Sequence, residues 1–384
     1  MVAVSRKFGG GASRIVREWG MPPRSRAGMA LVPVDPSEER RIRQYYELRT
    51  QVMRADLPHD PPPCWVYERG RFHYPWPGES EQLWVVQASG AVVGACLLTL
   101  PLLDNLHNAG GEIMVAPEHR GRGIGRALLD RLRREAARHR RTQLVLSVDH
   151  PLDPAAPDPV SSFLSASGAQ RALVQTRRRL DVDSANPQVL DRLAARARTM
   201  SAGYQLVQWV GATPARWLDD IAYLTARMST DVPLGDLQWE PETYDAARVR
   251  AVEASCLARG LHLVTTAARD RSGPLVAFTR IVSYATSPWF GGQWDTIVAP
   301  QHRGRRLGIL IKVANLHYAR AQRAQLRIID TCNADSNPYI ITINEAMGFR
   351  PHCRTIDWQL TVLAAPAGSR AVEGGGPETV GVCG

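Results

Sequence analysis

Lysine is nearly absent from this sequence, and closely spaced cysteine pairs are missing altogether. Only Lys7 and Lys312 are lysines among its 47 Lys and Arg residues. Six cysteines are scattered along the chain: Cys64, Cys96, Cys256, Cys332, Cys353 and Cys383. Without a CxxC pair, this spacing fits neither a disulfide scaffold nor a zinc site. We therefore expect reduced thiols and no metal.

Long apolar runs are also missing, so the sequence offers no transmembrane segment. The first twenty residues, MVAVSRKFGGGASRIVREWG, carry Arg and Lys but lack the apolar core of a secretory signal. We expect a cytoplasmic, globular chain without a membrane partner.

A net charge of +10 would suit an anionic partner such as nucleic acid, a membrane or a phosphorylated cofactor. The basic residues are spread along the chain, however, and form no basic aromatic platform of the kind that binds nucleic acid. The predominance of Arg, with abundant Ala and Gly, is typical of coding bias in a GC-rich genome. We expect no nucleic-acid partner.

One octapeptide occurs twice: VAPEHRGR begins at Val115 and VAPQHRGR at Val298, an offset of 298 − 115 = 183 residues. A chain of 384 residues, at about 100–200 residues per domain, has room for two domains. The repeat therefore predicts two domains of one design.

Helix and strand patterns follow the same order in both halves. The first half predicts a helix at 38–56, a proline- and aromatic-rich loop at 58–80, a hairpin at 82–102, a strand at 111–117, a helix at 123–139 and a strand at 142–148. The second half predicts a helix at 213–228, a hairpin at 261–284, a strand at 294–300, a helix at 306–322 and a strand at 326–333. Both halves are expected to be mixed α/β units.

Composition and turn signals suggest the boundaries. Asn186-Pro187 can start a linker helix between the halves. The expected organisation is a flexible segment 1–30, a domain 31–183, the linker helix 184–200, a domain 201–364 and a disordered tail 365–384.

In each copy, a strand ends at a proline and passes through His-Arg-Gly into an amphipathic helix. The free N–H groups and positive dipole end of such a helix form an anion site. In the first copy, Gly123 and Gly125 let the backbone approach a pyrophosphate, and Arg120 and Arg122 add charged donors. The loop is neither a Walker loop nor a dinucleotide fingerprint. One copy could be a simple glycine turn, but two corresponding copies argue against that.

The motif Val115-x-Pro117 followed by Arg120-x-x-Gly123-x-Gly125 resembles the acyl-CoA-binding motif of the GNAT acyltransferases. The segments HRGRRLGILIKVANL and TCNADSNPYIITINEAMGF are similar to the second half of actinobacterial tandem GNAT proteins, a group that includes mycothiol synthase. The resemblance covers about residues 31–363.

The resemblance implies two tandem GNAT-like domains, each a twisted mixed sheet flanked by helices that splays open after its fourth strand. It also implies acetyl-CoA or another acyl-CoA as donor, and direct attack by the amine of a small molecule or peptide-like metabolite. We expect a monomer or homodimer. The residues implied to contact the acyl-CoA are Met114, Val115, Arg120, Gly121, Arg122, Gly123, Ile124, Gly125, Arg126, Ile297, Val298, Arg303, Gly304, Arg305, Arg306, Leu307, Gly308, Asn333 and Asn337.

The second copy departs from the family pattern because Arg306 stands where the first glycine is expected. If its backbone adopts the required angles, Arg306 can extend along the phosphates. If it does not, the loop is distorted and binds more weakly. We favour binding.

Acylation of an amine needs a base and a proton source for the leaving thiolate. The candidate bases are Glu112 and Asp295, which occupy equivalent positions on the strand before each loop. The alternative for each is a solvated carboxylate at a strand edge. Asp149 and His150 are weaker candidates, expected to form a turn.

Members of this family often supply the acid from a Tyr four residues before a Gly-Phe pair. Here Asn344 precedes Gly348-Phe349 at that spacing. Tyr339 is the nearest phenol, and packing explains it equally well. The matching segment of the first half has Leu164, so neither half shows a complete acid–base pair.

We therefore expect both halves to hold CoA and the C-terminal half to catalyse N-acyl transfer. The alternative is a CoA-binding sensor or scaffold in which one or both halves are non-catalytic. The aromatic loop 58–80 could wall an acceptor pocket, although ordinary packing beneath a long loop is the favoured explanation.

Overall fold

The computed structural model describes residues 30–152, 158–271 and 273–362. The expected flexible segment before Ala30 and the expected tail 365–384 lie outside these residues. The helices are α1 Glu39–Asp56, α2 Trp65–His73, α3 Ile124–Arg138, α4 Pro159–Ala166, α5 Pro187–Met200, α6 Leu218–Asp231, α7 Ala246–Ala258, α8 Leu307–Gln322 and α9 Pro338–Met347. The strands are β1 Ala30–Val34, β2 Glu79–Ala88, β3 Ala91–Pro101, β4 Asn108–Val115, β5 Gln143–Pro151, β6 Gln170–Asp181, β7 Tyr204–Val210, β8 Leu261–Asp270, β9 Leu275–Tyr284, β10 Phe290–Val298, β11 Ile328–Ala334 and β12 Arg350–Thr361.

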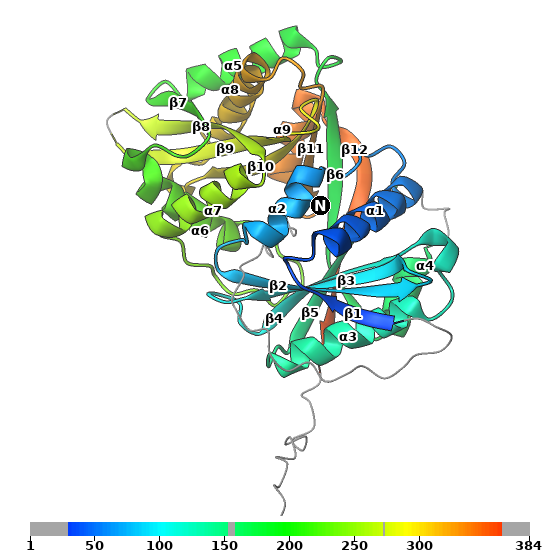
Figure 1. The fold of residues 1–384 in the computed structure, drawn as a ribbon. Coiled ribbons are helices and arrows are strands. Elements are labelled where there is room, and N and C mark those ends of the chain that lie inside the picture. The colour runs from blue at the N-terminus through cyan, green and yellow to red at the C-terminus, as the bar shows by residue number, and fades with distance from the viewer. Residues whose placement is uncertain (1–29, 153–157, 272, 363–384) are drawn as a thin grey trace, which may run out of the picture.

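All of these strands join one mixed sheet in the order β1-β2-β3-β4-β5-β12-β6-β11-β10-β9-β8-β7 (Figure 1). Pairing is parallel between β4 and β5 and between β10 and β11, and antiparallel elsewhere. The predicted mixed α/β class, with sheets flanked by helices, is confirmed.

The two halves exchange their last strands at the middle of this sheet. Strand β12, from the end of the chain, pairs with β5 from Gln143↔Thr361 to Pro151↔Cys353. Strand β6, from the first half, pairs with β11 from Asp181↔Ile328 to Gln175↔Ala334. The two exchanged strands also pair with each other, so the halves are not closed units.

Side chains follow the exchange. Trp358 on β12 is 1% exposed and packs with Trp84 and Leu128 in the core of the first half. Leu180 on β6 is likewise 1% exposed and packs with Leu310 and Phe349 in the core of the second half. Each half therefore completes the hydrophobic core of the other.

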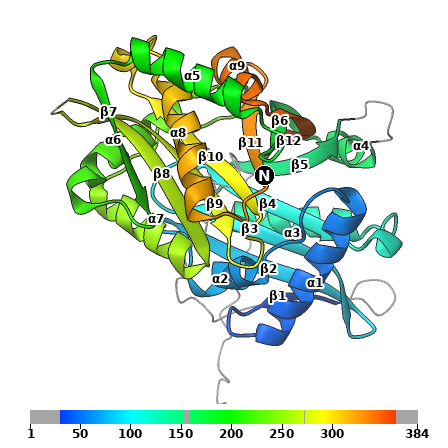
Figure 2. The ribbon, with the colours of Figure 1, turned by 90° about the horizontal axis from the view of Figure 1, so that it is seen from above.

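Helices cover both faces of the sheet in each half. In the C-terminal half, α5 and α8 pack on one face and α6 and α7 on the other (Figure 2). In the N-terminal half, α3 and α4 share one core with the sheet, while α1 packs over the opposite face. Among the described residues, no helix combines the length and apolar character needed to cross a membrane.

Several local predictions need correction. Residues Trp65–His73 form helix α2 inside the segment predicted as a loop, because the prolines lie before and after them. Strand β5 extends through Asp149 and His150, where a turn was expected, because β12 pairs with it there. Helix α5 begins at Pro187, where a helix start was predicted, and the Asn186 side chain caps it by accepting hydrogen bonds from the backbone N–H groups of Gln188 and Val189.

The exchange makes each half depend on the other for folding. We expect fragments 30–183 and 184–362, expressed separately, to expose unpaired strands β5 and β11 and to aggregate. Co-expressed, they should assemble into a soluble complex with the circular dichroism spectrum of the intact chain. Two separately soluble fragments, each with a cooperative thermal transition, would contradict this account.

Candidate functional site

The two repeated loops have the same backbone course. Each strand passes through a short 3-10 turn, Pro117–His119 or Pro300–His302, before its helix starts. The residue preceding each helix is left-handed: Gly123 has φ 82° and ψ −2°, and Arg306 has φ 56° and ψ 20°. Arg306 thus adopts the conformation that the family pattern assigns to glycine.

The first arginine of each motif braces its loop. Arg120 donates to both carboxylate oxygens of Asp56 at 2.8 Å, and its Nε donates to the carbonyl of the last residue of β4. Arg303 pairs with Asp231 and donates to the last carbonyl of β10 in the same way. Both aspartates end the first helix of their half. These arginines therefore shape the loop, and the backbone N–H groups remain the main anion donors.

The loop glycines fit a phosphate group. A Cβ added to Gly121, Gly123 or Gly304 would meet no atom within 4 Å. At Gly125, the nearest atoms to such a Cβ would be those of Phe163 and Val115, at 3.9 and 4.0 Å. Internal packing does not require glycine at position 125, whereas close approach of a ligand to the backbone explains it. The cradle therefore fits the pyrophosphate of an acyl-CoA.

Beyond each cradle the sheet splays open, as the resemblance implied. Pairing between β4 and β5 ends at Gly111↔Leu146, although both strands continue. Pairing between β10 and β11 ends at Gly292↔Asp330, and both of these strands also continue. We call these gaps the N-terminal opening and the C-terminal opening.

A cavity of about 210 Å³ passes through the C-terminal opening. Its walls come from α6 and α7 on one face of the sheet and from α8 and α9 on the other. Asp295, Asn333 and Asn337 all line it, so three residues predicted from sequence lie around one space.

A β-bulge distinguishes this opening from the other. The register between β9 and β10 shifts between Gln293 and Thr296, which places one extra residue in β10 beside Asp295. Strand β4 pairs with β3 without such a shift. Because a bulge redirects side chains, the equivalent carboxylates Asp295 and Glu112 face different surroundings.

The residues considered as acids are placed differently from one another. Asn344 on α9 is fully buried, and its Nδ2 donates to Oδ1 of Asn333 at 2.6 Å. Tyr339 is 85% exposed, so it neither packs in the core nor lines the cavity. Asn337 caps α9 by accepting the N–H of Ile340 at 3.4 Å. The C-terminal opening therefore has a part-buried amide pair where a phenol of α9 was expected, and the phenol that lines the cavity, Tyr244, comes from the loop before α7.

Lys312 on α8 was missed from the sequence. It is 0% exposed, lines the cavity, and its Nζ lies 5.4 Å from the ring centre of Phe349. Its Nζ hydrogen-bonds to no other described residue. The position equivalent to Lys312 in the first copy is Leu129, since 312 − 183 = 129. The sequence did hold one signal for Lys312, because this rare lysine stands where the first copy has a leucine.

Glu112 lies in an ion cluster at the N-terminal opening. It accepts from Arg49 at 2.8 Å and from Arg71 at 3.1 Å, and these arginines also pair with Glu68 and Glu81. Burial alone would raise the pKa of Glu112, but Arg71 and Arg49 lower it to about 2. A carboxylate with so low a pKa is a weak proton acceptor. These contacts favour a structural role for Glu112.

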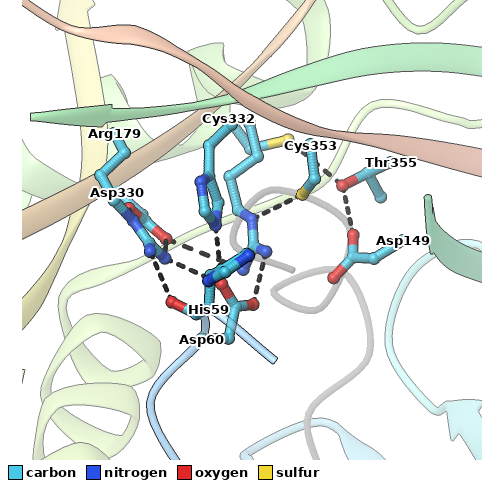
Figure 3. Close-up of polar contacts among 10 residues, drawn as sticks. His59, Asp60, Asp149, Arg179, Asp330, Cys332, Cys353 and Thr355 are labelled. Atoms are coloured by element: carbon cyan, nitrogen blue, oxygen red, sulfur yellow. Dashed lines mark hydrogen bonds and ion pairs between the residues drawn. The ribbon is translucent and has the colours of Figure 1, made fainter. Parts of the chain in front are cut away.

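A polar network crosses the four central strands between the openings (Figure 3). Arg179 on β6 donates to Asp330 on β11 at 2.7 Å and to Asp60 at 2.9 Å. Figure 3 shows these contacts at one end and the hydrogen bond from Thr355 on β12 to Asp149 on β5 at the other. The network fixes the exchanged strands relative to the loop between α1 and α2.

A second cavity of about 130 Å³ lies between the halves, and Tyr67 and Trp76 of the predicted aromatic segment line it. Trp76 and Trp294 border both cavities. Within residues 30–152, 158–271 and 273–362, no group of three or more His, Cys, Asp or Glu side chains could hold a metal ion.

Comparisons with known proteins agree with this geometry. The family described as Acetyltransferase (GNAT) domain matches residues 79–157. A tandem GNAT protein from the clavulanic acid biosynthesis pathway, solved without acetyl-CoA, is 31% identical; the alignment covers 88% of this chain and 100% of that one, with a TM-score of 0.74. No match was found among curated proteins.

More distant structures share the fold alone. A GCN5-related N-acetyltransferase from Sphaerobacter thermophilus is 15% identical over 89% of this chain and 97% of its own, with a TM-score of 0.58. A glucosamine N-acetyltransferase region of a fungal multi-domain beta-N-acetylglucosaminidase is 14% identical over 88% of this chain and 38% of its own, with a TM-score of 0.59.

The left-handed backbone of Arg306 gives a testable stability effect. Such a conformation costs a non-glycine residue about 1–2 kcal/mol. Arg306→Gly should therefore raise the free energy of unfolding by about 1 kcal/mol in urea denaturation, while CoA binds several-fold more weakly because a cation beside the cradle is lost. Gly123→Ala, the matched change in the first loop, should destabilise the chain. An unchanged or lower stability of Arg306→Gly would contradict this interpretation.

The buried Lys312 makes stability depend on pH. Burial lowers the pKa of Lys312 from 10.5 to about 7. Between about pH 7 and pH 10, the unfolded chain binds more protons at this residue than the folded chain, so stability rises with pH. Denaturant melts should show the wild type gaining stability relative to Lys312→Met across this range, and a constant difference below about pH 7. A constant difference across the whole range would contradict the shift.

Proposed function

The chain belongs to the GNAT acetyltransferase family and is an acyltransferase, and from this premise we propose that its C-terminal opening transfers a short acyl group from acyl-CoA to the amine of a small molecule. The observation that carries the proposal is the 210 Å³ cavity through the gap between β10 and β11. Its lining comes from both faces of the sheet, with Lys312 of α8 on the side of the cradle and Ile221 of α6 and Val249 of α7 on the other side.

Asp295 is the proposed base. It lies on the bulged strand, is 8% exposed and lines the cavity. Glu253, another carboxylate in the cavity wall, is already occupied: it accepts from Arg280 at 2.5 Å and from the N–H and hydroxyl of Thr213 at 2.7 Å. Asp295 lines the cavity from the part of β10 that continues beyond its pairing with β11, and we propose that it takes the proton that the amine loses as it attacks the thioester carbonyl.

The acyl-CoA supplies the activated acyl group, and residues of this chain hold it. Helix α8 presents its N-terminal N–H groups to the pyrophosphate, and Arg306 at the head of that helix adds a positive charge. Asn333, on the splayed part of β11, lies where it can bind the amides of the pantetheine arm. The hydrogen bond from Asn344, which is itself fully buried, holds the half-buried Asn333 side chain in place.

The acceptor is proposed to be a small amine with an apolar body. The carboxylate of Asp295 suits an approaching cation, while Ile221, Met228 and Val249 give the cavity apolar walls. The 31% identical relative is a tandem GNAT protein from a small-molecule pathway, which supports this class of acceptor. A finer relationship to the actinobacterial group that includes mycothiol synthase stays a prediction from the sequence.

For the N-terminal half, we propose that it holds acyl-CoA without turning it over. Its glycine cradle is intact, yet Glu112 is held by two arginines and the strand that carries it has no bulge. The sensor or scaffold alternative, in which CoA binds without turnover, would thus apply to the N-terminal half alone.

Matched charge insertions test which half is the catalyst. Gly125 and Gly308 are the second residues of α3 and α8, where an aspartate is compatible with the helix dipole but repels a phosphate. An added Cβ would lie 3.2 Å from the Ile343 side chain at Gly308 and 3.9 Å from that of Phe163 at Gly125, so the Ile343 side chain must shift slightly in Gly308→Asp. With acetyl-CoA and an amine panel, Gly308→Asp should lower thiol release by about two orders of magnitude. Gly125→Asp should leave release within about twofold of wild type, because the N-terminal opening is not the catalyst.

The reverse pattern would assign catalysis to the N-terminal half. Circular dichroism and thermal melts of both variants control for folding. If the wild type released no thiol with any amine but calorimetry showed CoA binding, the sensor alternative would replace the proposed function.

A further inference from the structure

Lys312 is an unexplained cation in the wall of the C-terminal cavity. It is fully buried, its Nζ has no hydrogen-bond partner among the described residues, and no carboxylate of those residues pairs with it. The chain uses arginine for nearly every other positive charge, since 45 of 47 Lys and Arg residues are Arg. The cation most tightly enclosed in the cavity wall is therefore one of the only two lysines in the sequence.

Packing alone would favour an apolar residue here. The residues on either side of Lys312 in the chain, Ile311 and Val313, are buried and apolar, and Asn315, one turn further along α8, is a buried polar residue with its own hydrogen-bond partners. In the first copy the equivalent Leu129 is 1% exposed and packs in an apolar core. A buried unpaired amine destabilises a fold, so its presence in only one copy points to a role in the cavity.

Lys312 lies in a site that lacks the expected proton donor for the leaving sulfur. Asn344 replaces the residue expected to protonate the leaving sulfur, and its Oδ1 is buried with no partner among the described residues. Both Lys312 and Asn333, which Asn344 contacts, line the cavity at the opening. A lysine ammonium has three donors and can serve both an amide oxygen and a sulfur.

We propose that Lys312 is the proton donor for the CoA thiolate released in acyl transfer, in place of the tyrosine that Asn344 replaces on α9. The inference rests on the proposed function of the C-terminal opening. As the amine nitrogen bonds to the thioester carbon, the carbon–sulfur bond breaks. The sulfur takes a proton from the Lys312 ammonium, and the nitrogen gives a proton to Asp295. Return of that proton to the amine of Lys312 through solvent completes the cycle.

The protonation of Lys312 suits this role. Burial lowers its pKa to about 7, so near neutral pH the ammonium can give up its proton and regain it. Other charged or titratable groups around the cavity are Glu242, Tyr244, Glu253, Arg280, Asp295 and Cys332, from the loop before α7, from α7 and from strands β9 to β11. Glu253 and Arg280 neutralise each other. Turnover should fall as pH rises through the pKa of Lys312.

Binding measurements test the proposal without turnover. The ligands are CoA and desulfo-CoA, which lacks the sulfur, and the protein carries Gly125→Asp so that only the C-terminal opening binds. We expect this protein to bind CoA about tenfold more tightly than desulfo-CoA, because Lys312 stabilises the thiolate. With Lys312→Met added, the two affinities should become equal, and with Lys312→Arg the preference should return.

Leu129→Met is the matched control, because it makes a similar exchange at the equivalent position of the other half. It should change neither the preference for CoA nor the rate of thiol release. Lys312→Met should slow thiol release at least tenfold and remove the fall in turnover above about pH 7. Its thermal stability should equal or exceed that of the wild type, which separates a lost proton donor from a damaged fold.

Two outcomes would overturn the assignment: an unchanged preference for CoA over desulfo-CoA in Lys312→Met, or an unchanged pH profile of thiol release. Failure of the proposed function looks different. In that case no amine releases thiol from the wild type, while the binding comparison still reports whether Lys312 interacts with the sulfur.

Discussion

Backbone hydrogen bonds among the four central strands hold the rest of this structure in place. Strands β5, β12, β6 and β11 alternate between the two halves of the chain, and every pairing among them is antiparallel. Strand β5 borders the N-terminal opening and pairs on its other edge with β12 from the C-terminal half. Strand β11 borders the C-terminal opening and pairs on its other edge with β6 from the N-terminal half. The position of either opening thus depends on both halves, which accounts for the polar network across these strands (Figure 3).

On this shared frame, the two openings have diverged in chemistry more than in shape. The loops follow the same backbone course, and both motif arginines pair with the aspartate that ends the first helix. The differences concern charge and register. Glu112 is bound by two arginines, whereas Asp295 lies on a bulge beside a cavity, and Leu129 is replaced by Lys312. Both halves have the architecture of the family, and we assign the catalytic chemistry to the C-terminal half.

Local signals in the sequence were sufficient for much of the fold. The octapeptides, the glycines after them and the apolar periodicity located both cradles, and Asn186-Pro187 located α5, because caps and turns depend on neighbouring residues. The exchange of β6 and β12 was not predictable in the same way. Their partners lie up to about two hundred residues away, and either strand would suit either half by its apolar pattern.

The site shows the same limit. Asp295, Asn333 and Asn337 were candidates from the sequence, and all three line one cavity, while their roles stay predictions. The sequence could not separate Glu112 from Asp295, because the arginines that hold Glu112 come from α1 and α2, far away in the chain. The burial of Lys312 was also unreadable, since only tertiary packing shows which helix positions lie next to the opening.

The most direct test of the division between the halves is a crystal structure of the protein with acetyl-CoA and a bound amine. Our account predicts pantetheine arms in both openings, with the amine only in the C-terminal cavity and the thioester between Asp295 and Lys312. Acetyl-CoA confined to the gap between β4 and β5, with the amine beside Glu112, would contradict it.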